Sequence, residues 1–343
     1  DAQESRGLGD VYKRQALRNK EEGTLIEVKN LVKRYGDHVA VKNLSFTVEE
    51  GQIYGFLGPN GAGKSTTMNI IPGYLASTEG EVLINGHNIL EEPEEAKKCI
   101  GYLPELPPVY TDMTVLEYLK FVAELKKIPK DQRKKQILEV MNLVKITDMQ
   151  NRLIKNLSKG YRQRVGLAQA VLGFPEIIIL DEPSVGLDPK QIIEIRELIR
   201  QLAKKHTVIL SSHILAEVRE VCDYILIISK GKLVASDTPE NLERNLGDSD
   251  LIEIETKASP DEVRRILETV DGIRSISTKH LENGITWAQI QEKKNTDIRE
   301  KVFQAFAQNH QPLLKLNPLQ VSLEDVFMEL TQSDRAAEEY AEK

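Results

Sequence analysis

Hydrophobic and polar residues alternate along the chain in patterns that predict strands and helices in turn. The stretches TLIEVKNLV, from Thr24, and VAVKNLSFTV, from Val39, alternate with the period of two that a half-buried strand shows. The runs QIYGFLG, IIIL, TVILSS and YILIIS have the length and composition of buried strands, whereas KQIIEIRELIRQLAKK and LAEVREVC have helical spacing. This alternation predicts an α/β domain over 24–245, a mixed sheet with a parallel core and helices on both faces.

Two further regions have patterns of their own. Residues from about 104 to 160 are mostly helical in pattern and predict a helical subdomain within the α/β domain. From residue 249 the segments LIEIETK, SPDEVRRILETV, IRSISTK, ITWAQIQ, DIREKVFQAFAQ and LLKLN follow the order β-α-β-β-α-β, and the helix SLEDVFMELT comes next. That order is typical of a ferredoxin-like domain, so a small α+β domain is predicted at 249–331.

The ends of the chain show no such pattern. Residues 1–23 are polar and lack a starting Met, and we expect them to be a disordered or non-native extension. Residues 332–343 are rich in charge and are expected to form a loose tail.

Composition narrows the possible functions. The 343 residues are 40% hydrophobic and 29% charged, as in ordinary globular domains, and the formal net charge of -7 argues against a general nucleic-acid binder. Cys99 and Cys222 are far apart and form neither a zinc set nor a disulfide framework, which fits a reducing cytoplasm. No apolar run approaches the roughly 18–20 residues needed to cross a bilayer.

A glycine-rich loop between a predicted strand and a predicted helix is the strongest chemical signal. It matches G-x-x-x-x-G-K-[ST] and consists of Gly58, Pro59, Asn60, Gly61, Ala62, Gly63, Lys64, Ser65 and Thr66. Glycines let backbone N–H groups approach an anion closely, and the following helix adds its positive end. Lys64 is expected to reach the β- and γ-phosphates of a nucleotide, and Ser65 to ligate Mg²⁺. The alternative, a plain glycine turn, explains neither the lysine nor the flanking elements.

Two acids follow the apolar run IIIL. Asp181 and Glu182 stand at the carboxyl end of a predicted strand, where open α/β sheets bind ligands. Asp181 is a candidate for holding Mg²⁺ through its water shell, and Glu182 for orienting and deprotonating an attacking water. An acidic pair after a strand is often only a solvated loop, but the phosphate loop upstream favours the catalytic interpretation.

A third motif lies between these two. LSKGYRQR at 157–164 places a capping serine, Ser158, and a glycine, Gly160, at the start of a predicted helix. It resembles the signature motif L-S-G-G-Q of ABC (ATP-binding cassette) ATPases, although Lys159 and Tyr161 stand where that motif has a glycine and the glutamine. With three motifs in this order, residues of about 24–240 are identified as a P-loop ATPase cassette of the ABC class.

The resemblance implies further residue roles. Tyr35 matches the aromatic residue that stacks on adenine, and His213 matches the switch histidine that contacts the γ-phosphate. Asp188 lies in SVGLD, which matches the loop that couples two sites. Glu105, in GYLPE, stands where the family usually has a glutamine that senses Mg²⁺ and the membrane partner; a carboxylate is a stronger ligand for a hard cation than an amide.

The resemblance also implies a mechanism and partners. ATP would lie between the phosphate loop of one cassette and the signature of a second copy, or of a homologous cassette. Binding and hydrolysis would drive a separate transmembrane permease, most often an exporter, from the cytoplasmic face of the cell membrane. Pro107, Val109, Tyr110 and the helix near Val115 are candidates for contacting that permease.

Other functions compatible with the motifs were weighed against this one. A soluble ABC ATPase of translation normally carries two cassettes in one chain, and a DNA-repair ATPase carries a long insertion between the motifs. A silent regulatory cassette would not need Lys64, Asp181, Glu182 and His213 intact. The domain at 249–331 shows no cluster of ligand-binding residues, so a structural or dimer-stabilising role is favoured over a regulatory one.

Overall fold

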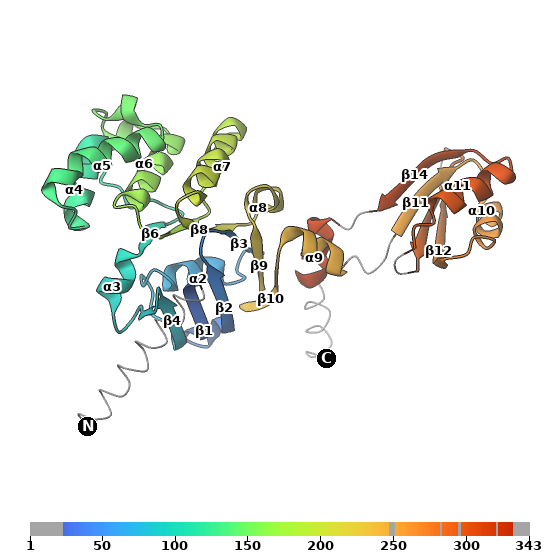
Figure 1. Ribbon diagram of the computed structural model, residues 1–343, viewed down its shortest axis with the longest axis horizontal. Helices are drawn as coiled ribbons and strands as arrows, with labels where there is room; N and C mark the ends of the chain where they lie inside the picture. Colours follow the sequence, from blue (N-terminus) through green and yellow to red (C-terminus); the bar gives the residue numbers. More distant parts are fainter. Residues whose placement is uncertain (1–22, 247–250, 282, 294–295, 320–321, 332–343) are drawn as a thin grey trace, which may run out of the picture. The chain divides into compact units, whose positions relative to one another are not determined.

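The computed structural model describes residues 23–246, 251–281, 283–293, 296–319 and 322–331. These residues form two compact units, one that extends to Pro239 and one from Glu240 to Glu329. The predictions made for residues 1–22 and 332–343 lie outside the described residues. Figure 1 shows the elements of each unit.

The first unit contains a six-stranded sheet with the order β10-β9-β3-β8-β7-β6. Strands β9, β3, β8, β7 and β6 pair in parallel, and β10 pairs antiparallel with β9 at one edge. Every residue of β3, β7 and β8 is buried, which explains why these strands read as continuous apolar runs. The strand bounds are β3 (Ile53–Leu57), β6 (Ile100–Leu103), β7 (Ile177–Asp181), β8 (Thr207–Ser212), β9 (Tyr224–Ser229) and β10 (Lys232–Asp237).

A second, antiparallel sheet of the same unit has the order β2-β1-β4-β5. Its strands are β1 (Thr24–Tyr35), β2 (His38–Glu49), β4 (Glu79–Ile84) and β5 (His87–Asn88). Ile26, Phe56, Met68 and Ile84 belong to one hydrophobic core to which both sheets and helix α2 (Lys64–Ile70) contribute. Helix α2 is thus anchored in the core, and its first residue is the lysine of the phosphate loop.

Helices surround the six-stranded sheet. A group of three, α4, α5 and α6, lies beside β6, with α6 packed against that strand (Figure 1). Helix α4 begins with a capping box in which Thr114 and Glu117 bond each other's backbone N–H groups. The helices of this unit, besides α2, are α3 (Pro93–Lys98), α4 (Val115–Leu125), α5 (Lys130–Leu143), α6 (Lys159–Val171), α7 (Pro189–Ala203) and α8 (Leu215–Val221), with 3₁₀ turns η1 (Thr147–Met149) and η2 (Ile154–Asn156). Helix α9 (Pro239–Leu246) falls, from Glu240 on, within the second unit.

The second unit has a four-stranded antiparallel sheet with the order β12-β13-β11-β14. Its chain order is β-α-β-β-α-β, the arrangement of a ferredoxin-like domain. Val263, Ile266, Val302 and Phe306 of its two helices pack with alternate strand residues into a separate core. The elements are β11 (Leu251–Thr256), α10 (Pro260–Leu267), β12 (Ile273–His280), β13 (Thr286–Glu292), α11 (Arg299–Gln308) and β14 (Leu313–Leu319), and a further helix covers 323–331.

Candidate nucleotide-binding site

The loop between β3 and α2 needs glycine at two positions for steric reasons. A Cβ atom on Gly58 would lie 2.4 Å from the carbonyl oxygen of Ile228, and one on Gly63 would lie 2.6 Å from that of Ala40. Gly63 also has a φ of 102°, in the left-handed region that side chains rarely adopt. The loop therefore packs directly against neighbouring backbone, which holds its own backbone in place.

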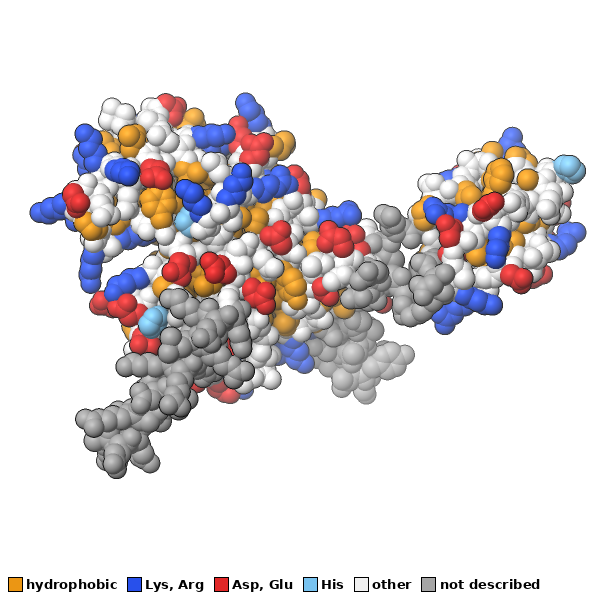
Figure 2. Space-filling model, in the orientation of Figure 1, with side chains coloured by type: hydrophobic (Ala, Val, Ile, Leu, Met, Phe, Trp, Pro, Cys, Tyr) orange, Lys and Arg blue, Asp and Glu red, His pale blue; other side chains and the backbone are white. Residues whose placement is uncertain are grey.

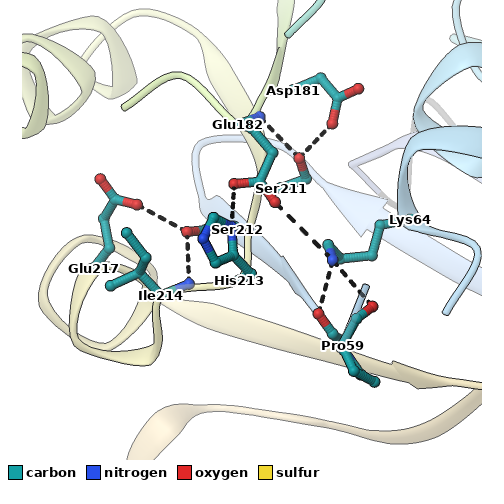
Figure 3. A network of polar contacts seen from close by, with 10 residues as sticks. Pro59, Lys64, Asp181, Glu182, Ser211, Ser212, His213, Ile214 and Glu217 are labelled. Carbon is teal, nitrogen blue, oxygen red and sulfur yellow. Dashed lines mark hydrogen bonds and ion pairs between the residues drawn. The ribbon is translucent and has the colours of Figure 1, made fainter. Parts of the chain in front are cut away.

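Lys64 is buried beneath this loop. Its Nζ atom donates hydrogen bonds to the carbonyl oxygens of Gly58, at 2.7 Å, and Pro59, at 3.3 Å, and lies 4.0 Å from Oε1 of Glu182 (Figure 3). Burial lowers the pKa of Lys64, and the negative charges of Glu182, Asp181 and Glu105 act in the opposite direction. The ammonium group is thus surrounded by acceptors at the floor of the site.

The two acids after β7 occupy different environments. Asp181 ends the strand and accepts a hydrogen bond from the Ser211 hydroxyl at 2.5 Å. Burial raises its pKa, and that hydrogen bond opposes the rise. Glu182 has a φ of 47°, a conformation that is costly for a side chain with a Cβ atom. Its Oε2 atom lies 2.8 Å from Nδ1 of His213, which follows β8 (Figure 3).

These groups border one pocket of about 430 Å³. Tyr35, half exposed, stands at its rim with the ammonium group of Lys33 5.2 Å from its ring centre. The residues that line the pocket are Tyr35, His38, Ala40, Asn60, Gly61, Gly63, Lys64, Ser65, Thr66, Glu105, Glu182, Val185 and His213. Of the predicted site residues, Gly58, Pro59, Ala62 and Asp181 are not among those lining it, although the first three belong to the loop and Asp181 neighbours Glu182.

Three predicted residues lie apart from this pocket. Ser158 caps helix α6 and accepts from the N–H of Tyr161, and Asp188 caps α7 and accepts from the N–H of Gln191 at 2.9 Å. A Cβ atom on Gly160 would lie 2.8 Å from the side chain of Gln191, so the starts of α6 and α7 are in contact. None of the three lines the phosphate-loop pocket. One chain therefore carries two separate sets of predicted nucleotide contacts.

The carboxylates of Asp181 and Glu105 and the hydroxyl group of Ser65 suit a metal ion whose remaining ligands do not come from the protein. Within the described residues, no group of three His, Cys, Asp or Glu side chains is arranged to hold a metal ion by itself. Mg²⁺ at nucleotide sites takes one or two carboxylates and fills its shell with phosphate oxygens and water. Ser65, Asp181 and Glu105 provide donors of that kind near the loop, so the residues present fit Mg²⁺ bound together with a nucleotide.

Sequence reasoning missed several residues of this site: His38 and Ala40 line the pocket, and Ser211 supports the two acids. Ser211, in the predicted strand TVILSS, contacts both Asp181 and Glu182. The only signal for Ser211 was that two serines end an otherwise apolar run. That pattern does not predict which neighbouring strand their side chains contact.

Known proteins with similar sequences share most of the chain's length. The sequence profile of the ABC transporter family matches residues 41–185. The ABC transporter ATP-binding protein YhcH of Bacillus subtilis is 35% identical over 93% of this chain and 99% of its own length. The linearmycin resistance ATP-binding protein LnrL of the same species is 30% identical over 90% of this chain and 98% of its own length. The bacitracin transport ATP-binding protein BcrA of Bacillus licheniformis is 40% identical over 62% and 69%.

Solved structures agree with the fold. A structure described as the ATP-binding subunit of an ABC transporter superposes with a TM-score of 0.61 at 31% identity, covering 65% of this chain and 94% of its own. The dimeric ABC transporter cassette MJ0796 superposes with a TM-score of 0.58 at 28% identity. The match covers 62% of this chain and 98% of the MJ0796 chain. The same cassette has also been solved as a dimer in a post-hydrolysis state with ADP and Pi, with a TM-score of 0.57.

The chain belongs to the family of ABC transporter ATP-binding proteins. It is an ATP-binding and ATP-hydrolysing subunit of a transporter, and the predicted P-loop cassette fold is confirmed. YhcH and BcrA are named as ABC transporter and transport ATP-binding proteins, and nothing in these comparisons favours the alternative of a soluble ABC ATPase. None of the helices in the described ranges is long and apolar enough to cross a membrane.

Proposed function

We propose that ATP binds in the phosphate-loop pocket, with its phosphates on the N–H groups of the loop and on Lys64. Tyr35 stacks on the adenine, as its exposed ring at the rim of the pocket permits. Ser65, Asp181 and Glu105 hold Mg²⁺, which when bound neutralises charge on the phosphates. Glu182 orients and deprotonates the attacking water, and His213 contacts the γ-phosphate.

One observation carries this assignment. Lys64, Glu182 and His213 come from three elements that are distant in sequence, yet Glu182 lies 2.8 Å from His213 and 4.0 Å from Lys64 beside a phosphate-binding loop. A basic group for the phosphates and an acid for the water are what phosphoryl transfer by positioning requires.

Replacing the proposed base tests it. Glu182→Gln keeps the size of the side chain and removes its ability to take a proton, so ATP turnover should fall by about a hundredfold or more while ATP binding is retained. Glu197→Gln, on the exposed surface of α7, is the matched control and should leave turnover unchanged. Near-normal turnover of the Glu182→Gln variant would remove Glu182 from this role.

The separation of the two sets of contacts supports a composite site. Because Ser158 and Gly160 do not line the pocket of their own chain, we propose that they face the ATP bound to a second copy, as in a head-to-tail dimer. Light scattering of the Glu182→Gln variant should show dimers when ATP is added. A persistent monomer at saturating ATP and high protein concentration counts against the proposal.

Mixing two inactive variants tests the same idea more sharply. Lys64→Ala damages the loop side of both sites, and Ser158→Arg damages the signature side of both. In a mixed dimer one site keeps an intact Lys64 and an intact Ser158, so mixing should restore turnover that neither variant has alone. If the mixture stays inactive while both variants are folded, the two sides do not come from different chains.

We further propose that the chain works on the cytoplasmic face of the membrane and powers export through a separate permease. The names of LnrL and BcrA, a resistance protein and an antibiotic transport protein, support export. The docking surface is proposed around Leu106 and Tyr110, two hydrophobic residues that are 79% and 55% exposed. Figure 2 shows hydrophobic side chains interspersed with Lys and Arg over the region of α4–α6.

Co-purification identifies the partner. The Glu182→Gln variant, isolated with ATP from solubilised membranes, should bring a protein with several transmembrane helices. Adding Leu106→Glu and Tyr110→Glu should abolish its recovery, whereas Leu138→Glu, at another exposed hydrophobic position, on α5, should not. Recovery of ribosomes, or of no membrane protein, would contradict the transporter proposal and favour a soluble ABC ATPase.

A further inference from the structure

Ser211 lies between the two acids of the site. Its side chain is completely buried at the carboxyl end of β8. The hydroxyl group donates to Oδ1 of Asp181 at 2.5 Å and accepts from the backbone N–H of Glu182 at 2.9 Å (Figure 3). The hydroxyl oxygen of Ser211 is therefore hydrogen-bonded to both Asp181 and Glu182.

The position of Ser211 follows from strand register. Strands β7 and β8 pair in parallel with Asp181 opposite Ser211, so the serine reaches the aspartate across one strand spacing. Glu182 is the first residue beyond the strand, where the ladder of backbone hydrogen bonds ends. The Ser211 hydroxyl satisfies the N–H of Glu182 at that point.

The backbone of Glu182 has an unfavourable conformation that a hydrogen bond to its N–H would help to hold. Its φ of 47° is unfavourable for a residue with a Cβ atom and persists only where the surroundings impose it. This conformation accompanies the approach of its carboxylate to Nδ1 of His213 and towards Lys64. Losing the anchoring bond would allow Glu182 to relax and its carboxylate to move.

We propose that Ser211 is a positioning residue that keeps Asp181 and Glu182 in one fixed geometry. Through Asp181 it orients a carboxylate for the metal, and through the N–H of Glu182 it aims the carboxylate that activates water. The inference rests on the proposed roles of these two acids in ATP hydrolysis.

The same strand offers a matched control. Thr207, at the opposite end of β8, is also buried, and its Oγ1 atom accepts from the N–H of Gly51 at 2.8 Å. Thr207→Val removes a buried hydroxyl group and one backbone hydrogen bond without contacting either acid. Its effect measures what a merely structural hydroxyl contributes.

Steady-state turnover of Ser211→Ala, Ser211→Thr and Thr207→Val is the first measurement. Hydrogen bonds to charged groups are strong enough that Ser211→Ala should lower kcat about tenfold to a hundredfold, with a smaller change in KM for ATP. Ser211→Thr keeps the hydroxyl on a side chain suited to a strand and should restore most of kcat. Thr207→Val should lower neither parameter once melting temperatures show that it is folded.

Metal binding gives a second readout that does not depend on turnover. With Mn²⁺ as the probe, the electron paramagnetic resonance signal of free metal is followed in the Glu182→Gln variant with ATP. Adding Ser211→Ala should weaken Mn²⁺ binding about tenfold, because the Asp181 carboxylate loses its orienting donor. Adding Thr207→Val should leave Mn²⁺ binding unchanged.

The outcomes distinguish a failure of the proposed ATPase function from a failure of the role proposed for Ser211. If the unaltered chain neither binds nor hydrolyses ATP, the proposed function fails. If it hydrolyses ATP and Ser211→Ala matches Thr207→Val in kcat or in Mn²⁺ affinity, Ser211 is only a buried, satisfied serine and the inference is wrong. A folded Ser211→Thr variant that stays as slow as Ser211→Ala also overturns it.

Discussion

Helix α10 of the second unit begins with a capping box that can be removed by one substitution. The Ser259 hydroxyl accepts from the N–H of Glu262 at 3.4 Å, and the Glu262 carboxylate accepts from the N–H of Ser259 at 3.0 Å. Ser259→Ala removes the hydroxyl group, so the N–H of Glu262 loses its partner, whereas the backbone N–H of residue 259 can still donate to the Glu262 carboxylate. The expected loss is about 1 kcal/mol, the usual effect of replacing a capping serine.

That loss should be visible because the second unit is small. It spans Glu240–Glu329 and has its own hydrophobic core, so we expect it to unfold as a separate transition. A loss of about 1 kcal/mol in a domain of this size lowers Tm by roughly 4–8 °C.

Trp287 makes the assay specific. It is the only tryptophan of the chain and lies on β13, where its Nε1 atom donates to Glu253 at 3.2 Å. Fluorescence excited at 295 nm therefore reports the second unit, and circular dichroism reports both. Thr114→Ala removes the equivalent capping box of α4 in the first unit and is the matched control. It should leave the Trp287 transition in place.

The pH dependence follows from the same box. The hydrogen bond from the Ser259 backbone lowers the pKa of Glu262 below its ordinary value. A lowered pKa in the folded state stabilises the unit above the ordinary pKa of a glutamate, and this contribution is lost as pH falls through the folded pKa. Ser259→Ala keeps the backbone N–H but removes the hydroxyl group, the second donor that lowers this pKa, so the difference in Tm between the unaltered chain and Ser259→Ala should shrink in acid. A shift below about 1 °C at neutral pH, against the 4–8 °C expected, would refute the reasoning.

Three other substitutions test the first unit. Gly58→Ala places a Cβ atom 2.4 Å from the Ile228 carbonyl, so binding of a fluorescent ATP analogue should be lost, with Gly36→Ala, whose Cβ meets open space, as the less damaging comparison. Tyr35→Ala should raise KM for ATP about tenfold by removing a stacking surface, and Tyr35→Phe should not; equal KM values for both variants contradict adenine stacking. Phe56→Ala should cost about 3–5 kcal/mol in the core between the sheets, seen as earlier unfolding by circular dichroism with no change in the Trp287 transition.

Local patterns were enough to predict most of the elements and their types. The run at 177–180 was predicted to be a buried strand, because four consecutive branched apolar residues bounded by polar ones are short for a helix and suit a strand covered on both faces. The spacing of Gly58, Gly63 and Lys64 indicated a phosphate loop, since glycine is needed where backbone must approach closely. The capping box of Ser259 and Glu262 at the start of α10 is equally local, because it joins residues three apart.

Pairings between distant segments could not be predicted in this way. The assignment of β1 and β4 to a second, antiparallel sheet depends on partners more than 40 residues apart. The alternation of β1 was visible in the sequence, but the shorter strands β4 and β5 were not predicted. The bond from Ser211 to Asp181 depends on the register of β7 and β8, which the sequence of either strand alone does not specify.

The sequence by itself therefore determined the class of fold, and it predicted the phosphate loop and the residue types of the candidate site, because each depends on neighbours along the chain. Only the tertiary structure decided that Lys64, Glu182 and His213 converge on one pocket, that Glu182 has a left-handed backbone anchored by Ser211, and that Ser158 lies outside the pocket. Those facts depend on which strands pair and in what register, and that is settled when the whole core packs.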